Sequence, residues 1–463
     1  MIYLVDIPNL HFEELIIENL EIAYLASDLV SHEYSVQVID GKGIHRNKTH
    51  KEIEEELRKA APNNIIFYAS EFTYEAILRM ISKLKRTNCF NAILVGPRVV
   101  LGGGSLMENH KEIDLIISGD PISKLTKVLN GDFSTPGITY RKRGKLIHNE
   151  IQPDNSTLDT YPIALREIGG TNLLTKTMTD GKEYYIVPMR SSRGCTHNCS
   201  FCGIPAQNRK NSIKWRSRSI DSLMQEIRML HDRYKNIEIR FLDENFSGDF
   251  ERAVNIAESI SQFKNIVFSF TARVDTIIRV DECILSRMYD CGLRGIEIGI
   301  ENFNDNVLRR YRKGHTCQEA ISAIRKIRNN RITPGIDFIM FDPWTTREEL
   351  QHNMDVIKHE GIDVSSNPVV YDRLYPHIGT AFRDVIDMNS YFENDEISEI
   401  YHKMQLFKVE LHKVRSILSH DKKMLSSLVM LKSPYTLLAE LIDNPFMPLN
   451  ASIAYRTLKG LVC

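Results

Sequence analysis

The chain has 463 residues, an apolar content of 42%, a charged content of 26% and a formal net charge of -1. This length predicts two or three domains, because a single hydrophobic core rarely grows past about 250–300 residues. The near-neutral charge does not favour a nucleic acid as partner, and no apolar run approaches the ~20 residues that cross a bilayer. We therefore expect a cytoplasmic globular protein that binds neither nucleic acid nor membrane.

The first part of the chain alternates short apolar strands with helices. Strands are expected at residues 2–5, 35–39, 65–69, 92–95 and 115–118. Helical patterns lie between them, at residues 13–29, at 52–60 and up to residue 84. Five buried strands separated by helices predict a Rossmann-like (flavodoxin-like) parallel sheet domain over residues 1–131, with ligands beyond the carboxyl ends of the strands.

Residues 132–180 are rich in Gly, Pro, Asp, Ser and Thr, and we expect a linker there with a small hairpin around residues 141–145.

A second alternating region, residues 181–384, predicts a partial (β/α)₆ TIM-type barrel with its catalytic groups on the loops after the strands. Its strands are expected at residues 185–189, 238–242, 267–271, 295–300, 335–341 and 364–370. Its amphipathic helices are expected at residues 221–234, 250–263, 318–328 and 347–359. Residues 385–463 predict a helical C-terminal region that Pro434, Pro445 and Pro448 interrupt.

The loop after the first barrel strand carries three closely spaced cysteines, Cys195, Cys199 and Cys202. Thiolates at C-x₃-C-x₂-C spacing can wrap one iron–sulfur cubane, which normally takes four protein ligands. Three ligands leave one iron open to bind a cofactor or substrate. The alternative is a zinc site that uses His197 as its fourth ligand, although His197 lies only two residues from Cys195 and the ligation would be cramped.

This cysteine spacing, with Phe201 immediately before the third cysteine, resembles the radical S-adenosylmethionine (SAM) superfamily. The resemblance implies a 4Fe–4S cluster on the three cysteines, SAM on the open iron, and reductive cleavage of SAM to a 5′-deoxyadenosyl radical. It also implies a reductant such as flavodoxin or ferredoxin.

The same resemblance assigns SAM contacts to side chains at the ends of later strands. Phe201 is expected against the adenine, Asp243 and Glu244 at the amino group, Arg273 at the carboxylate and Glu301 at the ribose. The chain lacks the glycine-rich GGE-like sequence of many relatives, so Asp243 and Glu244 have helix capping as their alternative, and Arg273 has a structural ion pair with Asp275.

The order of a sheet domain followed by a cluster barrel resembles the class B radical SAM enzymes, which have an N-terminal cobalamin-binding domain. The implied contacts for cobalamin are Ser70, Gly96 and Gly119, all at strand ends. The Asp-x-His-x-x-Gly motif that supplies a cobalt ligand in many corrinoid proteins is absent. Fold-level analogy alone does not identify a ligand, so a sheet domain without a cofactor stays open as an alternative.

We therefore expect a cobalamin-dependent methyltransferase acting on an unactivated carbon of a small metabolite or peptide. The alternatives are a cobalamin-free radical SAM enzyme for cyclisation, elimination or rearrangement, and a zinc-stabilised binding protein. The sequence identifies no catalytic side chain of the chain's own and does not define the substrate. Cys463 is interpreted as a frayed terminus.

Overall fold

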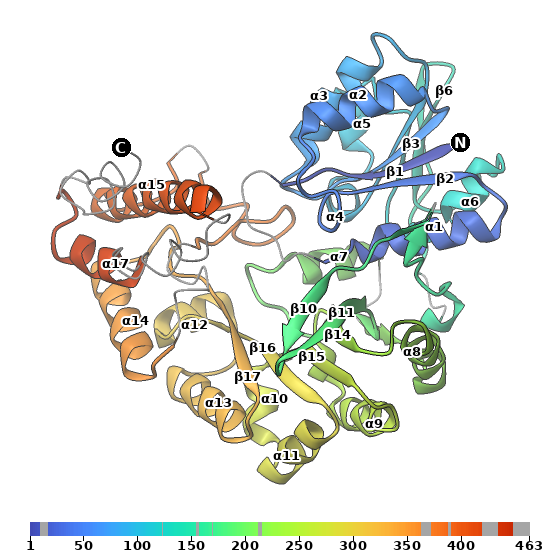
Figure 1. Cartoon of the computed structure of the whole chain (residues 1–463). Helices are drawn as coiled ribbons and strands as arrows, with labels where there is room; N and C mark the ends of the chain where they lie inside the picture. Colours follow the sequence, from blue (N-terminus) through green and yellow to red (C-terminus); the bar gives the residue numbers. More distant parts are fainter. Residues whose placement is uncertain are drawn as a thin grey trace.

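The computed structural model describes residues 1–9, 17–122, 124–153, 157–168, 170–211, 215–362, 372–387, 390–418 and 434–447. It contains an N-terminal α/β unit, a curved sheet surrounded by helices, and two C-terminal helices (Figure 1). The predicted fold class, a Rossmann-like sheet followed by a partial barrel and a helical C-terminal region, is confirmed.

The N-terminal sheet has seven strands in the order β2-β1-β3-β4-β5-β6-β7. The first five strands run parallel, and β6 and β7 are antiparallel. Its strands are β1 (Ile2–Asp6), β2 (Val36–Asp40), β3 (Asn64–Tyr68), β4 (Asn91–Val95), β5 (Leu115–Ile117), β6 (Ile138–Lys142) and β7 (Lys145–His148).

Helices cover both faces of this sheet because successive side chains of a strand point to opposite sides. Leu4 packs with helix α1, whereas its neighbour Val5 packs with α2 and α3 on the other face. The helices of this unit are α1 (Leu20–Ser31), α2 (His50–Ala60), α3 (Tyr74–Leu84), α4 (Pro97–Gly102), α5 (Ser105–Asn109) and α6 (Lys124–Leu129).

Helix α1 begins later than the predicted residue 13. Its N-cap is Asn19, whose side chain accepts hydrogen bonds from the backbone N–H groups of Glu21 and Ile22. A side chain that satisfies the free N–H groups of the first turn is the local signal that starts a helix. Residues 10–16 lie outside the described residues.

The expected hairpin near residues 141–145 is present, but it belongs to the sheet rather than to a linker. Strand β6 pairs with β5 and then with β7, so the hairpin extends the N-terminal sheet by two strands. The rest of the predicted linker holds a short helix, η1 (Leu158–Thr160), and the small pair β8 (Glu167–Ile168) and β9 (Thr171–Asn172).

The barrel sheet has six strands in the order β10-β11-β14-β15-β16-β17. They are β10 (Lys176–Thr179), β11 (Lys182–Met189), β14 (Ile237–Phe241), β15 (Ile266–Arg273), β16 (Leu293–Glu301) and β17 (Thr333–Phe338). Strand β10 is an antiparallel edge that the sequence analysis did not predict, and β17 ends at Phe338 rather than at Phe341. The predicted strand at residues 364–370 lies outside the described residues.

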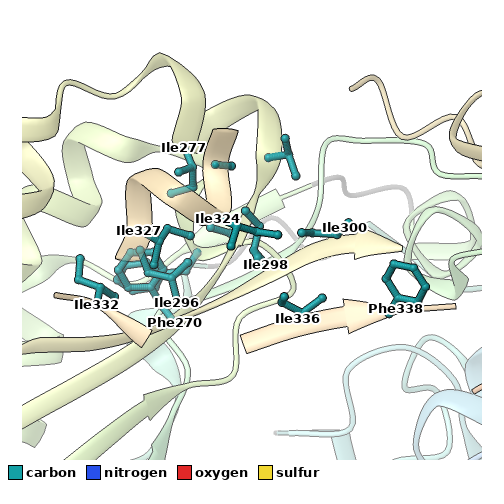
Figure 2. Close-up of a cluster of buried hydrophobic side chains, with 14 of the residues drawn as sticks. Phe270, Ile277, Ile296, Ile298, Ile300, Ile324, Ile327, Ile332, Ile336 and Phe338 are labelled. Atoms are coloured by element: carbon teal, nitrogen blue, oxygen red, sulfur yellow. The ribbon is translucent and has the colours of Figure 1, made fainter. Parts of the chain in front are cut away.

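Helices pack against the outer face of the barrel sheet. Figure 2 shows part of this core, in which Ile296, Ile298 and Ile300 of β16 meet Ile324 and Ile327 of α13. The helices are α8 (Ile220–Tyr234), η2 (Phe246–Gly248), α9 (Phe250–Ile260), α10 (Val274–Arg279), α11 (Glu282–Asp290), α12 (Asp305–Tyr311), α13 (Cys317–Asn329) and α14 (Arg347–His359).

The opposite face of β16 opens onto the lumen of the half-barrel. Glu297 and Gly299 lie in phase on that face. The register shifts between Gly299 and Glu301, so the predicted alternation is interrupted there, although the Glu301 carboxylate still lies beside Gly299. A cavity of about 560 Å³ lies in the lumen, and Arg240, Glu297 and Gly335 are among its lining residues.

The C-terminal region contains α15 (Asp395–Leu418) and α17 (Pro434–Asp443), so helices are confirmed there. Pro434 is the first residue of α17, where a missing N–H costs nothing. None of the described helices is long and apolar enough to cross a membrane. Cys463 lies outside the described residues.

Candidate active site

The cysteine loop begins where β11 ends and leads through β12 (Ser192–Gly194) to α7 (Gly203–Asn211). Asp243, just after β14, holds the start of this loop. Its carboxylate accepts hydrogen bonds from the Ser191 backbone N–H at 2.8 Å and from the Ser191 and Ser192 hydroxyl groups at 2.6 Å each. Asp243 is buried, and its carboxylate oxygens are therefore used to position the loop.

Glu244 supports the same loop from the other side. One carboxylate oxygen accepts from the backbone N–H of Gly194 at 2.9 Å, and the other accepts from Arg190 at 2.7 Å. Neither Asp243 nor Glu244 caps helix α9, whose N-cap is Asp249. The capping alternative for these two residues is therefore wrong.

The three cysteines of the loop are free thiols of intermediate exposure. Burial raises the pKa of Cys195 and raises the pKa of Cys202 to about 12, and the neighbouring thiols of the loop add to both shifts. Mutual electrostatic influence of this kind requires the sulfur atoms to lie close together. The three thiols therefore influence one another on one short loop, and thiolates are the ligands that iron–sulfur clusters use.

The zinc alternative needs four ligands around a single ion. Among the residues that the structure describes, no group of three or more His, Cys, Asp or Glu side chains is arranged to hold a metal ion, and this finding includes the three loop thiols. Burial lowers the pKa of the His197 imidazole, and the positive charge of Arg273 lowers this pKa further.

Glu301 and Lys313 form a buried ion pair beside Phe201. The Lys313 ammonium donates to Glu301 at 3.0 Å and lies 6.0 Å from the centre of the Phe201 ring. Gly299 makes room for the pair, since a Cβ there would lie 2.9 Å from a Glu301 carboxylate oxygen. The sequence analysis selected Glu301 and Phe201 but missed Lys313, which no motif marks.

Arg273 lies at the end of β15, against the cysteine loop. Its Nε donates to Asp275 at 2.8 Å, so the ion pair considered as an alternative is present. Its Nη1 also donates to the sulfur of Cys199 at 3.6 Å. Arg273 therefore contacts a proposed cluster ligand directly.

A cavity of about 320 Å³ lies between the carboxyl edge of the N-terminal sheet and the cysteine loop. Gly96 and Gly119 line it at strand ends, as expected, and Gly194 lines it from the barrel side. Ser70 is not among its described lining residues. The Ser70 hydroxyl instead lies 2.9 Å from that of Thr73 in the turn that leads into α3.

Charged pairs join the two units around this cavity. Glu21 of α1 pairs with Arg193 at 2.6 Å and with Arg190 at 3.3 Å, and Asp120 pairs with Arg216 at 2.6 Å. All five residues line the cavity. The sequence analysis assigned these residues no role, because the partners lie far apart in the chain.

Amide side chains form another part of the cavity wall. Gln152, Gln207, Asn208 and Asn211 line it, three of them from α7. The side-chain oxygen of Asn211 is buried without a hydrogen-bond partner in the described residues. A buried acceptor of this kind favours a ligand that donates an N–H there.

Comparison with known families defines the class of this protein. Residues 189–357 match the Radical SAM superfamily. The matched segment contains the cysteine loop and strands β14 to β17, so this part of the chain is a radical SAM domain.

Curated relatives are similar at low identity. An uncharacterized methyltransferase of Pyrococcus horikoshii is 29% identical over 74% of this chain and 74% of its own length. The anaerobic magnesium-protoporphyrin IX monomethyl ester cyclase of a Synechocystis strain is 26% identical over 63% of this chain and 57% of its own length. The 4′-phospho-dehydrooxetanocin synthase of Priestia megaterium is 26% identical, and only 42% of its length is covered.

Solved structures share the architecture of this chain. The cobalamin-dependent SAM radical enzyme OxsB matches with a TM-score of 0.67 and 18% identity, covering 100% of this chain and 72% of OxsB. The radical SAM methyltransferase TsrM from Kitasatospora setae matches with a TM-score of 0.61 and 14% identity, covering 78% of this chain and 71% of TsrM. These likenesses establish the shared fold.

Proposed function

We propose that this chain is a cobalamin-dependent radical SAM methyltransferase that acts on an unactivated carbon of a small metabolite or peptide. The observation that carries the proposal is the cavity shared by the N-terminal sheet and the cysteine loop, because a corrinoid bound there would lie beside a cluster on that loop. The P. horikoshii relative and TsrM are named as methyltransferases, and OxsB is named as a cobalamin-dependent SAM radical enzyme; these names support the proposal.

Cys195, Cys199 and Cys202 would hold a 4Fe–4S cluster, and SAM would lie beside Phe201 and Glu301. When bound, the cluster with SAM supplies a 5′-deoxyadenosyl radical, and the corrinoid supplies a methyl group. The chain's own residues orient these groups. Asp243 and Glu244 position the loop through the hydrogen bonds described above, so their proposed role toward SAM is indirect.

The amide-lined wall of this cavity suits the periphery of a cobalamin, which carries several amide groups and a phosphate. Gln152, Gln207 and Asn211 offer amide donors and acceptors to such groups. Lys124 places a cation at the same wall. Gly96 and Gly119 have no side chain, so a ligand can approach the backbone closely at both positions.

The lumen of the half-barrel is the proposed place for the substrate. Asp243 and Thr271 are among the residues that line its cavity, which also carries a cation, Arg240, and a carboxylate, Glu297. A mainly apolar lumen with a few charged groups suits a small metabolite or a peptide segment. A flavodoxin or ferredoxin is the proposed electron donor.

The proposal is tested by anaerobic purification in the presence of hydroxocobalamin, iron and sulfide. We expect the absorption spectrum to show broad iron–sulfur absorption in the visible range together with corrinoid bands. We also expect SAM to be converted to both S-adenosylhomocysteine and 5′-deoxyadenosine. A triple variant with alanine at Cys195, Cys199 and Cys202 should lose the iron and both products. Cys291→Ala is the matched control, because Cys291 is a partly buried thiol on the barrel outside the loop.

Other outcomes would overturn the proposal in distinct ways. Release of 5′-deoxyadenosine alone, without corrinoid bands, would indicate a cobalamin-free radical SAM enzyme. Zinc at the three thiols and no cleavage of SAM would indicate a structural metal site.

A further inference from the structure

Arg273 is held in one orientation by three different acceptors. Its Nε donates to the Asp275 carboxylate at 2.8 Å, its Nη2 donates to the backbone carbonyl of Lys313, and its Nη1 donates to the Cys199 sulfur at 3.6 Å. The residue is 8% exposed. A guanidinium with a rigid fork of donors keeps such a geometry better than a flexible ammonium would.

Among the described cations near the cysteines, Arg273 is the one whose side chain hydrogen-bonds to a thiol. Lys313 is paired with Glu301 at 3.0 Å. Arg279, the other arginine near Asp275, lies 3.8 Å from that carboxylate with a side chain that is 76% exposed. The backbone N–H groups of His197 and Ile204 hydrogen-bond to the sulfurs of Cys195 and Cys202. Cys199 instead accepts from the charged side chain of Arg273.

We propose that Arg273 sets the reduction potential of the cluster through its N–H···S hydrogen bond to Cys199. This inference rests on the proposed function, because it requires a cluster on the three cysteines. Reduction adds one negative charge to the cluster and its sulfur ligands. A buried hydrogen bond and a positive charge at one sulfur stabilise that added charge, and hydrogen bonds to sulfur are known determinants of cluster potential.

This role differs from the SAM-carboxylate contact that the sequence predicts for Arg273. A carboxylate contact would affect SAM affinity and would not act before SAM binds. A contact to the cluster ligand acts in the absence of SAM. The two roles are therefore separated by measuring the potential without SAM and the affinity for SAM in the same variants.

The experiment uses the full chain with its cluster reconstituted anaerobically. Redox titrations without SAM, followed by electron paramagnetic resonance, compare the wild type with Arg273→Met, Arg273→Lys and the control Arg279→Met. We expect Arg273→Met to shift the midpoint to a more negative potential. A tenfold fall in the reduced-to-oxidised ratio at fixed potential corresponds to about 59 mV for a one-electron couple.

Arg273→Lys keeps the charge but loses the planar fork, so we expect a smaller shift in the same direction. Arg279→Met should keep the wild-type midpoint. A midpoint for Arg273→Met equal to that of the wild type, at equal iron and sulfide content, would overturn the inference. Weaker SAM binding without any change in potential would assign Arg273 to the SAM carboxylate instead.

Two outcomes separate this inference from the proposed function. If Arg273→Met does not assemble a cluster, the Arg273→Lys variant decides the question. If the wild-type chain itself takes up no cluster, the proposed function fails, and the inference about Arg273 fails with it.

Discussion

Arg166 joins the N-terminal unit to the barrel through two buried carboxylates. It donates to Glu18 at 2.7 Å and to Glu226 of α8 at 3.2 Å, and also to the backbone carbonyl of Pro188 at 2.8 Å. The side chains of Arg166, Glu18 and Glu226 are 4%, 1% and 0% exposed. Glu226 also pairs with Arg218, whereas Glu18 has no second ion-pair partner in the described residues. Replacing Arg166 by methionine therefore leaves the carboxylate of Glu18 buried without a cation.

The expected loss for the Arg166→Met variant is about 3–5 kcal/mol of unfolding free energy, the cost of removing one partner of a buried ion pair. Burial raises the pKa of Glu18 from 4.5 to about 7, while Arg166 acts to lower it. Without Arg166 this pKa rises further, so the folded chain binds a proton that the unfolded chain releases above about pH 4.5. The loss is therefore largest at alkaline pH and shrinks as the pH falls toward 4.5.

The assay is urea-induced unfolding followed by circular dichroism at about pH 8 and about pH 5. The double variant with Glu18→Gln and Arg166→Met should recover part of the loss, because no charge is then left unpaired at Glu18. The matched control is Arg233→Met, since Arg233 pairs with Glu167 with 57% of its side chain exposed. An exposed pair contributes about 0–1 kcal/mol. A loss for Arg166→Met no larger than that of this control at pH 8 would refute the reasoning.

Two further predictions concern carboxylates of the barrel. Asp243→Asn removes a carboxylate acceptor that Ser191 and Ser192 share. We expect the free energy of unfolding to fall by about 1–3 kcal/mol, and the chain to hold less iron after reconstitution. Unchanged iron content would contradict the loop-positioning role. Burial, together with Glu301 and Glu297, raises the pKa of Asp337 from 3.8 to about 7, so its contribution to stability falls as the pH rises from about 4 to about 7. Asp337→Asn should therefore raise the thermal midpoint at about pH 8 and change it little near pH 4, and a lower midpoint at pH 8 would count against it.

Much of the fold follows from local patterns in the chain. The parallel strands of both sheets appear close to their predicted residues because runs of apolar residues of strand length must be buried. Helix α14 has its predicted bounds, since Thr346 and Glu349 form a capping box that fixes its start. The cysteine loop could also be predicted from a local pattern, because its three proposed ligands lie within eight residues of one another.

The contacts that give the site its properties depend on residues far apart in the chain. Arg273 and Cys199 are 74 positions apart, and Arg166 and Glu18 are 148 apart. The hairpin β6–β7 looked like part of a linker, because its pairing with β5 is a tertiary event.

The sequence by itself determined the class of the site, since the spacing of Cys195, Cys199 and Cys202 is a local property of the chain. Only the tertiary structure decided which cations face those thiols and which surfaces enclose the cavity beside them. The physical reason is that burial and charge pairing depend on distances in space, and these are set when the two sheets pack against each other.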